Sequence, residues 1–197
     1  MIRNIQEALD DPNWKLAVLE EMNALKKNDT WEIVNLSRDK KTTGYKWVFS
    51  MKYRADDSIE RYKARLVAKG FTQTYGIDYQ EMLTPIVKIN SIQVLLSLAM
   101  NSNWPLHQLD VKNAFLNGDL EEEVFMSLPA GFEERLGVDK VCRLRKSLYG
   151  LKQSPRAWFE CFGKAVIHHE YCQSQADHTM FYKHSKKVKV LFDCLYG

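Results

Sequence analysis

The stretch "YKWVFSMKYRADDSIERYKARLVAKGF" (45–71) decides the fold, because two runs with the period of a β-strand flank the polar turn "ADDS" (55–58). In each run every second side chain is mostly aromatic or apolar, so one face of each predicted strand is suited to burial. The other face of the second run carries Lys63, Arg65, Val67 and Lys69. The pattern predicts an antiparallel β-hairpin with one basic face. Such a face can clamp phosphate groups, and it can equally be a solvated surface.

The segment before the hairpin is predicted to be helical over residues 1–27. Asp11 can cap a helix that has Pro12 in its first turn. One face of that helix carries Trp14, Ala17, Val18, Met22 and Leu25. The run "TWEIVNL" (30–36) between helix and hairpin has the residue types of a strand.

The segments after the hairpin alternate between helix and strand patterns. "NSIQVLLSLAM" (90–100) predicts a short helix capped by Ser91, with Ile92, Leu95, Leu96 and Ala99 pointing inward. "WPLHQLDVKNAF" (104–115) predicts a strand and its exit. Further strands are predicted after residue 116, from residue 141 and in a final pair near the C-terminus, and a helix follows Gly150 and runs to about His169. Helices mixed with antiparallel strand pairs predict an α+β fold, an antiparallel sheet with packed helices.

The composition indicates a globular chain. It has 197 residues, of which 45% are apolar and 27% charged, with a net charge of +3. It has no signal segment and no apolar run near the roughly 20 residues of a membrane helix, so we expect a soluble, intracellular protein without membrane contact. The cysteines Cys142, Cys161, Cys172 and Cys194 form no CxxC pair and are expected to be reduced structural thiols. His169 and Cys172 have a spacing that suits zinc, but no second ligand pair follows them.

Two polar features stand out against this background. Asp110, in "LHQLDVKNAF" (106–115), is an acid in a stretch that otherwise alternates like a half-buried strand. It can cap a turn, or it can bind Mg²⁺, which prefers carboxylates and keeps several waters. In "SLYGLKQSPRAWF" (147–159), Gly150 permits a tight turn and polar residues open a helix. Free amides at a helix start suit a phosphate or a base edge, although a purely structural loop explains the same pattern.

Together these stretches resemble the reverse transcriptase domain of Pol polyproteins from copia-type LTR retrotransposons. The resemblance runs from about Trp14 to Val190. It is carried by "NDTWEIV", "KWVFSMKYRADDSIERYKARLVAKGFTQTYGIDYQEM", "TPIVKINSI", "LHQLDVKNAFLNGDLEEEVFM", "PAGF" and "LRKSLYGLKQSPRAWF". Single residues such as Ser50 and Met82 depart from the family's usual pattern.

The resemblance implies the fingers and part of the palm of a right-hand polymerase. The N-terminal helical segment, residues 1–27, would precede them. The fingers would span about 28–90 and 116–153, and the incomplete palm would span about 91–115 and 154–197.

The resemblance also implies roles for individual residues. Asp110 would be the catalytic carboxylate that binds Mg²⁺, and the main-chain carbonyl of Val111 would add a metal ligand. Phe115 would lie under the incoming sugar and exclude a 2′-hydroxyl. Lys63 and Arg65 of the basic hairpin would grip the triphosphate. The remaining implied contacts are Gln153 with the nucleotide, and Lys69, Gly150, Ser154 and Pro155 with the template or primer.

Catalysis by such a site needs more carboxylates than Asp110. Nucleotidyl transfer uses two metals roughly 4 Å apart, which lower the charge on the attacking 3′-oxygen and the leaving pyrophosphate. The family supplies further ligands as an aspartate pair in a "YVDD" hairpin after "VKV". Here the sequence reads "LFDCLYG", in which Asp193 is the single acid.

We therefore expect a chain that is inactive alone but is related to proteins that bind RNA or DNA primer–template and deoxynucleotides. A nucleic-acid-binding module without catalysis is one alternative. An enzyme completed by other Pol segments is another.

Overall fold

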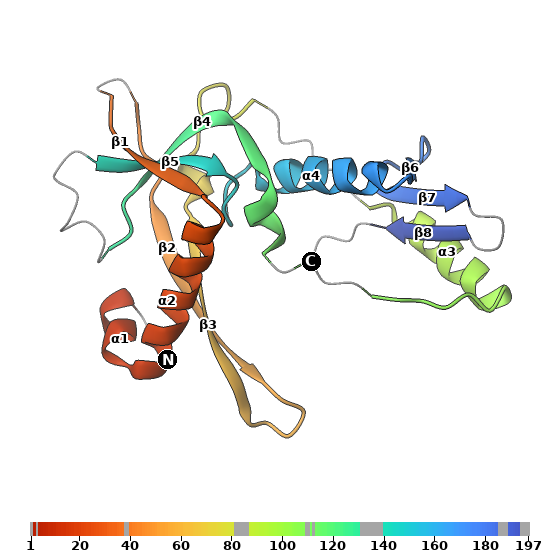
Figure 1. The fold of residues 1–197 in the computed structure, drawn as a ribbon, viewed down its shortest axis with the longest axis horizontal. Helices are drawn as coiled ribbons and strands as arrows, with labels where there is room; N and C mark the ends of the chain where they lie inside the picture. Colours follow the sequence, from red (N-terminus) through yellow and green to blue (C-terminus); the bar gives the residue numbers. More distant parts are fainter. Residues whose placement is uncertain are drawn as a thin grey trace. The chain divides into compact units, whose positions relative to one another are not determined.

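The computed structural model describes residues 2, 4–37, 40–80, 87–108, 111, 113–130, 140–184 and 189–193. The chain divides into two compact units. The first comprises Met1–Met82 and Phe115–Trp158, and the second comprises Leu83–Ala114 and Phe159–Gly197. Both contain helices, and the sheets of the described residues are antiparallel, which confirms the predicted α+β class (Figure 1).

The first unit begins with α1 (Ile5–Asp10) and α2 (Pro12–Lys27). The predicted start of α2 is confirmed, because the Asp11 carboxylate accepts hydrogen bonds from the N–H groups of Asn13 and Trp14 at 2.8 and 3.2 Å. These bonds satisfy donors that the first helical turn leaves unpaired. The buried residues of α2 include every residue of the predicted apolar face, and Glu21 is buried with them.

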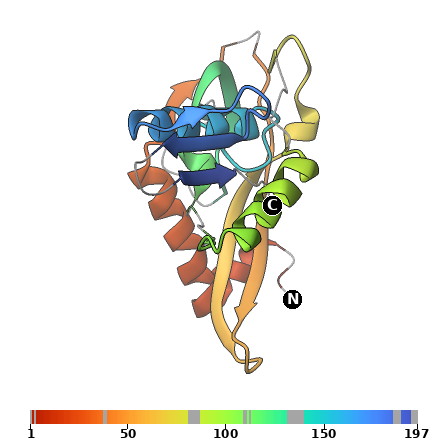
Figure 2. The ribbon, with the colours of Figure 1, turned by 90° about the vertical axis from the view of Figure 1, so that its right-hand side faces the viewer.

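The predicted hairpin is formed by β2 (Tyr45–Tyr53) and β3 (Ile59–Ala68), which pair antiparallel. Its apolar face packs on α2, where the Trp14 ring meets the rings of Phe49 and Tyr62 edge-on at 5.4 and 4.8 Å. Helix α2 runs along the hairpin in both ribbon views (Figures 1 and 2). Ala64 and Leu66 are fully buried between them. Burying one leucine contributes about 1.5–3 kcal/mol, so this contact fixes the helix to the hairpin.

A three-stranded sheet completes the first unit. Its order is β1 (Trp31–Asn35), β5 (Lys140–Lys146) and β4 (Asp119–Ser127), with β5 in the centre. Cys142 of β5 is fully buried and faces Ile33 on one side and Met126 on the other. Two short 3₁₀ helices, η1 (Gly70–Thr72) and η2 (Ala114–Asn117), lie in the connections.

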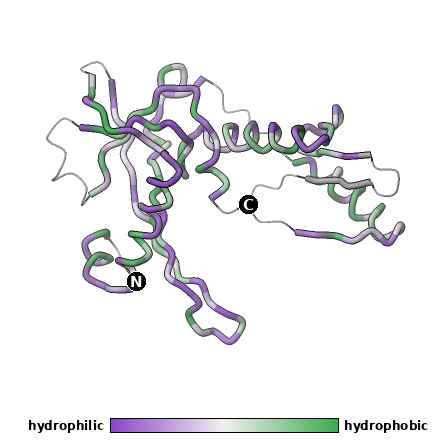
Figure 3. The backbone as a smooth tube through the Cα atoms, in the orientation of Figure 1, coloured by the Kyte–Doolittle hydropathy of each residue, from purple (hydrophilic) through white to green (hydrophobic). Residues whose placement is uncertain are grey.

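The second unit contains α3 (Ile89–Asn101) and a sheet of order β6 (Cys172–Gln173), β7 (Met180–His184) and β8 (Lys189–Asp193). The predicted final strand pair is confirmed as β7 and β8. Helix α4 (Ser154–His168) begins in the first unit and belongs to the second from Phe159 on, and hydrophilic and hydrophobic bands alternate along it (Figure 3). Phe181 is fully buried, with the rings of Phe159 and Phe162 at 6.1 and 5.7 Å.

Three sequence predictions in the second unit are not met by the described residues. Ser91 does not cap α3, because the helix starts after Lys88 and the Ser91 hydroxyl instead donates to the buried Asp177 carboxylate at 2.6 Å. Leu96 is 45% exposed and does not point inward. The strand predicted within residues 104–115 is also not seen in its described part, where residues 104–108 form no strand. An extended segment becomes a strand when a neighbouring strand pairs with it, and single-sequence alternation does not report that neighbour.

No helix in the described parts of the chain combines the length and the apolar character that crossing a membrane requires. The described cysteines, Cys142, Cys161 and Cys172, are free thiols, as predicted for them.

Candidate functional site

The main residue of the predicted metal site, Asp110, lies outside the described residues. Val111 is described, and its side chain is 44% exposed. The described residues contain no group of three or more histidine, cysteine, aspartate and glutamate side chains able to hold a metal ion. The Mg²⁺ site at Asp110 and Val111 therefore stays a prediction.

The hairpin presents a basic surface opposite the face that packs on α2. The strand register pairs Lys52 with Arg61, Ser50 with Lys63 and Val48 with Arg65. Directly opposed residues project from the same face of a sheet. The side chains of this surface, called here the outer face, are those of Lys46, Val48, Ser50, Lys52, Arg61, Lys63, Arg65 and Val67. All eight are described, and none of them is acidic.

The cations of the outer face are close enough to perturb each other. Partial burial lowers the pKa of Lys63, and the nearby charges of Arg65, Lys52 and Arg61 lower it further. Like charges opposite each other destabilise a strand pair. An anion bound on this face would relieve that repulsion, which makes the outer face suited to phosphate groups.

Arg65 differs from its neighbours because its guanidinium is anchored at the edge of β3. Its Nη1 donates to Glu21 Oε2 at 2.7 Å, and Glu21 Oε1 accepts from the Leu66 N–H at 3.3 Å. Burial raises the pKa of the Glu21 carboxyl, and Arg65 and the Leu66 N–H oppose that rise. The carboxylate thus pairs a cation and covers an exposed strand edge at the same time.

The aromatic ring of Tyr149 lies next to Arg65, and that of Phe115 lies next to Tyr149. The guanidinium carbon lies 5.8 Å from the centre of the Tyr149 ring, and the Tyr149 ring meets the Phe115 ring edge-on at 5.3 Å. The Phe115 carbonyl accepts a hydrogen bond from the Ser147 hydroxyl, which ties η2 to the end of β5. The structure therefore brings two predicted residues, Arg65 and Phe115, next to the same ring, that of Tyr149. The sequence reasoning missed Tyr149, although it directly precedes the predicted Gly150.

Gly150 docks the loop after β5 on the base of the hairpin. Its φ is +90°, and a methyl group in its place would overlap the Ala68 carbonyl oxygen and lie 2.7 Å from Val67 Cγ1. The Ala68 N–H donates to the Tyr149 carbonyl at 2.7 Å, so the two backbones are in direct contact. Glycine is required here both for its φ and for this close approach. The contact fixes Tyr149 beside β3.

The other residues predicted in this motif are mostly buried. Gln153 is 1% exposed, and its amide donates to the Asp78 carbonyl at 3.3 Å and accepts from Gln73 at 3.0 Å. Ser154 is 2% exposed and donates to the Leu148 carbonyl at 2.6 Å. These bonds hold the loop in shape. Contact of Gln153 or Ser154 with nucleotide or template stays a prediction, as it does for the half-buried Pro155 at the start of α4.

Lys69 lies just beyond the end of β3. Its N–H donates to the Gly44 carbonyl at 2.8 Å, and its half-buried side chain passes beside Gly44. Its predicted contact with template or primer is untested.

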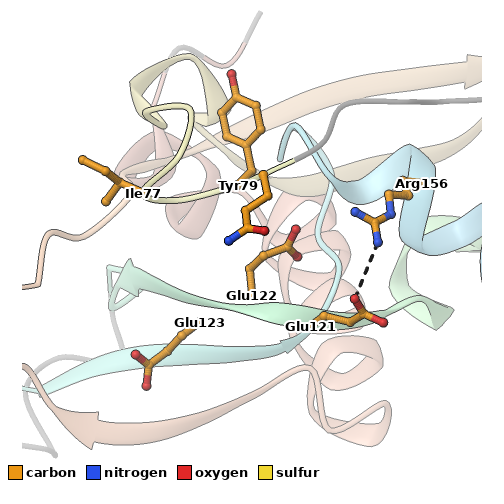
Figure 4. Close-up of a pocket in the computed structure, with 7 residues that line it drawn as sticks. Ile77, Tyr79, Glu121, Glu122, Glu123 and Arg156 are labelled. Carbon is orange, nitrogen blue, oxygen red and sulfur yellow. Dashed lines mark ion pairs between the residues drawn. The ribbon is translucent and has the colours of Figure 1, made fainter.

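A surface groove of 490 Å³ on the first unit has the opposite character (Figure 4). Glu121, Glu122 and Glu123 of β4 line it together with Tyr79, and Glu121 forms an ion pair of 3.5 Å with Arg156. Glu123 is paired with Lys40 at 2.8 Å, and the carboxylates of Glu121 and Glu122 against the one guanidinium of Arg156 still leave the lining negative. The groove therefore disfavours phosphate, and the outer face is the better candidate for an anionic ligand.

Comparison with known proteins supports the family predicted from the sequence. Residues 28–196 match the family described as Reverse transcriptase (RNA-dependent DNA polymerase). Over 180 residues the chain is 43% identical to the retrovirus-related Pol polyprotein from transposon RE2 of Arabidopsis thaliana, covering 91% of this chain and 12% of that protein. It is 44% identical over 180 residues to the retrovirus-related Pol polyprotein from transposon TNT 1-94 of Nicotiana tabacum, covering 91% and 14%.

A more distant match is the transposon Ty1-DR5 Gag-Pol polyprotein of Saccharomyces cerevisiae, 32% identical over 177 residues, or 88% of this chain and 10% of that protein. No solved structure matches the chain significantly. The chain thus spans between 10% and 14% of the length of these relatives. It belongs to the reverse transcriptase (RNA-dependent DNA polymerase) family, and its predicted resemblance to the domain found in copia-type retrotransposon Pol polyproteins is confirmed.

Proposed function

We propose that this chain supplies the fingers and part of the palm of an RNA-directed DNA polymerase. In this proposal the outer face of the hairpin holds phosphates of the primer–template and of the incoming deoxynucleotide. The observation that carries it is the strand register, which gathers Lys46, Lys52, Arg61, Lys63 and Arg65 on one face without an acidic residue. The boundaries of the two compact units fall close to those expected for fingers and palm, which supports the division.

The positions of the cations on the outer face suggest which phosphate groups each of them binds. Arg65 and Phe115 both lie next to the Tyr149 ring, so Arg65 is the cation best placed to meet the triphosphate of a nucleotide whose sugar rests on Phe115. Lys63 lies two residues before Arg65 in β3 and would share that charge. Lys52 and Arg61 are opposed further out along the strands, where they would meet the nucleic acid backbone. Side-chain cations and phosphates form strong charge-assisted hydrogen bonds.

The catalytic part of the proposal is carried over from the family. Mg²⁺ held by the Asp110 carboxylate and the Val111 carbonyl would neutralise charge on the reacting phosphate oxygens. We also propose that the 197-residue polypeptide by itself does not extend primers. Residues 189–197 offer Asp193 as their single acid, where the family has an aspartate pair. Activity would then require other Pol segments, and without them the chain would bind nucleic acid without catalysis.

The binding proposal is tested by the salt dependence of primer–template affinity. Each phosphate contact contributes about 0.9 to the slope of log affinity against log salt on a duplex. The triple variant Lys52→Glu, Arg61→Glu and Lys63→Glu should therefore bind more weakly, with a slope shallower by about 2.7. The matched control reverses Lys15, Lys26 and Lys41, which are exposed elsewhere in the first unit. Equal slopes for the two triple variants would contradict the proposal.

The catalytic proposal is tested by primer extension on an RNA template with Mg²⁺ and deoxynucleotides. We expect no extension above background by the 197-residue polypeptide. Template-dependent extension that disappears in the Asp110→Ala variant would show that the polypeptide is an active polymerase and would refute this part.

A further inference from the structure

Glu21 is an acidic residue on the face of α2 that packs against β3, and it is 2% exposed. A carboxylate buried there costs more than a well-packed apolar residue of similar size, so its presence needs a reason. The hydrogen bond to the edge of β3 is not a sufficient reason for a charged residue. A neutral amide oxygen could accept the 3.3 Å hydrogen bond from the Leu66 N–H equally well. The negative charge itself serves Arg65, whose Nη1 lies 2.7 Å from Glu21 Oε2.

The charge of Glu21 determines where the Arg65 guanidinium lies. By its place in β3, Arg65 belongs to the outer face, where Lys63 and other cations repel it. The guanidinium lies instead at the strand edge, where its Nη1 also donates to the Ala64 carbonyl at 3.2 Å. There it is 5.8 Å from the ring of Tyr149. Because a guanidinium is planar and rigid, these partners fix its orientation as well as its position.

We propose that Glu21 is a positioning residue whose carboxylate holds the Arg65 guanidinium beside Tyr149 and Phe115, ready for the triphosphate of an incoming nucleotide. This inference rests on the proposed function of the outer face. A guanidinium already held in place loses less side-chain freedom when the phosphates bind, so nucleotide affinity rises without a new contact. Glu21 itself touches no substrate in this role.

The first test measures nucleotide affinity. The 197-residue chain is bound to a primer–template with a chain-terminated primer and titrated with the complementary deoxynucleoside triphosphate and Mg²⁺. Losing a partner that orients a metal ligand costs about 10–100-fold. By analogy we expect the low end for Arg65, so Glu21→Gln should weaken triphosphate binding about tenfold. The control Glu20→Gln, at the exposed neighbouring position, should leave it unchanged. In an Arg65→Gln background, Glu21→Gln should have no further effect, because the interaction it removes is already gone.

The second test observes Arg65 directly. The side-chain Nε–Hε resonance of Arg65 is assigned by its loss in Arg65→Lys. Glu21→Gln should shift this resonance, and Glu20→Gln should not. Glutamine keeps an acceptor for the Leu66 N–H, and unfolding curves check that the variant folds. If it does not fold, Glu21→Asp carries both tests instead, because the shorter side chain keeps the charge but cannot hold the Arg65 guanidinium in the same place, so the Arg65 resonance should shift and triphosphate binding should weaken.

The outcomes separate this inference from the function on which it rests. An unmoved Arg65 resonance, or an equal loss of affinity with and without Arg65, overturns the positioning role of Glu21 even if the chain binds triphosphate well. Absence of triphosphate binding by the unmodified chain refutes the proposed function of the outer face, and the purpose assigned to Glu21 with it.

Discussion

Replacing Gly150 by alanine should lower the free energy of unfolding of the first unit more than a typical substitution on its surface would. The residue has a φ of +90°, which costs a non-glycine residue about 1–2 kcal/mol. The added methyl group would also overlap the Ala68 carbonyl and lie 2.7 Å from Val67 Cγ1. Forcing extra atoms into packed structure costs about 1–3 kcal/mol. The sum is about 2–5 kcal/mol, a large part of the 5–15 kcal/mol that holds a typical domain folded.

Gly76 provides the matched control for this substitution. Its φ is +79°, but a methyl group there would have no atom within 4 Å. Gly76→Ala should therefore lose the conformational part alone, about 1–2 kcal/mol. Urea unfolding followed by tryptophan fluorescence measures both variants, and an unchanged slope against urea shows that the unfolded state is the same. The difference between the two variants then gives the free energy of the close approach between Gly150 and β3.

The reasoning about Gly150 fails if both substitutions cost the same. In that case the position of the loop carrying Tyr149 would not depend on direct backbone contact with the hairpin. The contacts of the Tyr149 ring with Arg65 and Phe115 would then need another cause.

Two further predictions concern titratable groups. Burial raises the pKa of Asp177, but hydrogen bonds from Ser91 and Thr179 outweigh it and leave that pKa below its usual 3.8. The ionised form therefore stabilises the fold above about pH 4, and the free energy of unfolding should fall as pH drops through the lowered pKa. Asp177→Asn should remove this dependence and cost about 1–3 kcal/mol at neutral pH; acid-dependent urea titrations that match for both chains would contradict it. Burial also raises the pKa of Cys142 to about 12, so at pH 8 a thiol reagent should modify the exposed Cys172 and leave Cys142 intact until the chain unfolds. Equal rates at the two thiols in folded protein, read by mass spectrometry, would refute that assignment.

The hairpin could be predicted from sequence because a strand repeats every two residues. Alternation in residues 45–71 identifies both faces of each strand, but the register, which shifts between Lys52 and Tyr53, was seen only in the structure. The start of α2 was predictable for a similar reason, since Asp11 and Pro12 act on their immediate neighbours. Such features depend on residues close together in the chain.

The rest of the site depends on partners far apart in the chain, which a single sequence does not reveal. Gln153 and Gln73 are 80 positions apart, yet their side chains bond to each other, and each also bonds to the backbone near the other, Gln153 to the Asp78 carbonyl and Gln73 to the Lys152 N–H. Glu21 lies on the same face of α2 as Trp14 and Leu25. From the sequence alone an acidic side chain is expected to be exposed to solvent, and only the ion pair with Arg65 explains its burial. The resemblance to a polymerase family named Arg65 and Phe115 as candidates, and their shared neighbour Tyr149 was found only in the structure.

The most direct test of the central claim is lysine footprinting of the outer face. The chain is treated with acetic anhydride with and without primer–template, and modification is read residue by residue. The lowered pKa of Lys63 increases its neutral, reactive fraction, which aids its detection in the unbound chain. Primer–template should protect Lys52 and Lys63 and leave Lys15 and Lys26 unaffected. Unchanged modification of the outer-face lysines in the bound chain would contradict the claim that this surface holds nucleic acid.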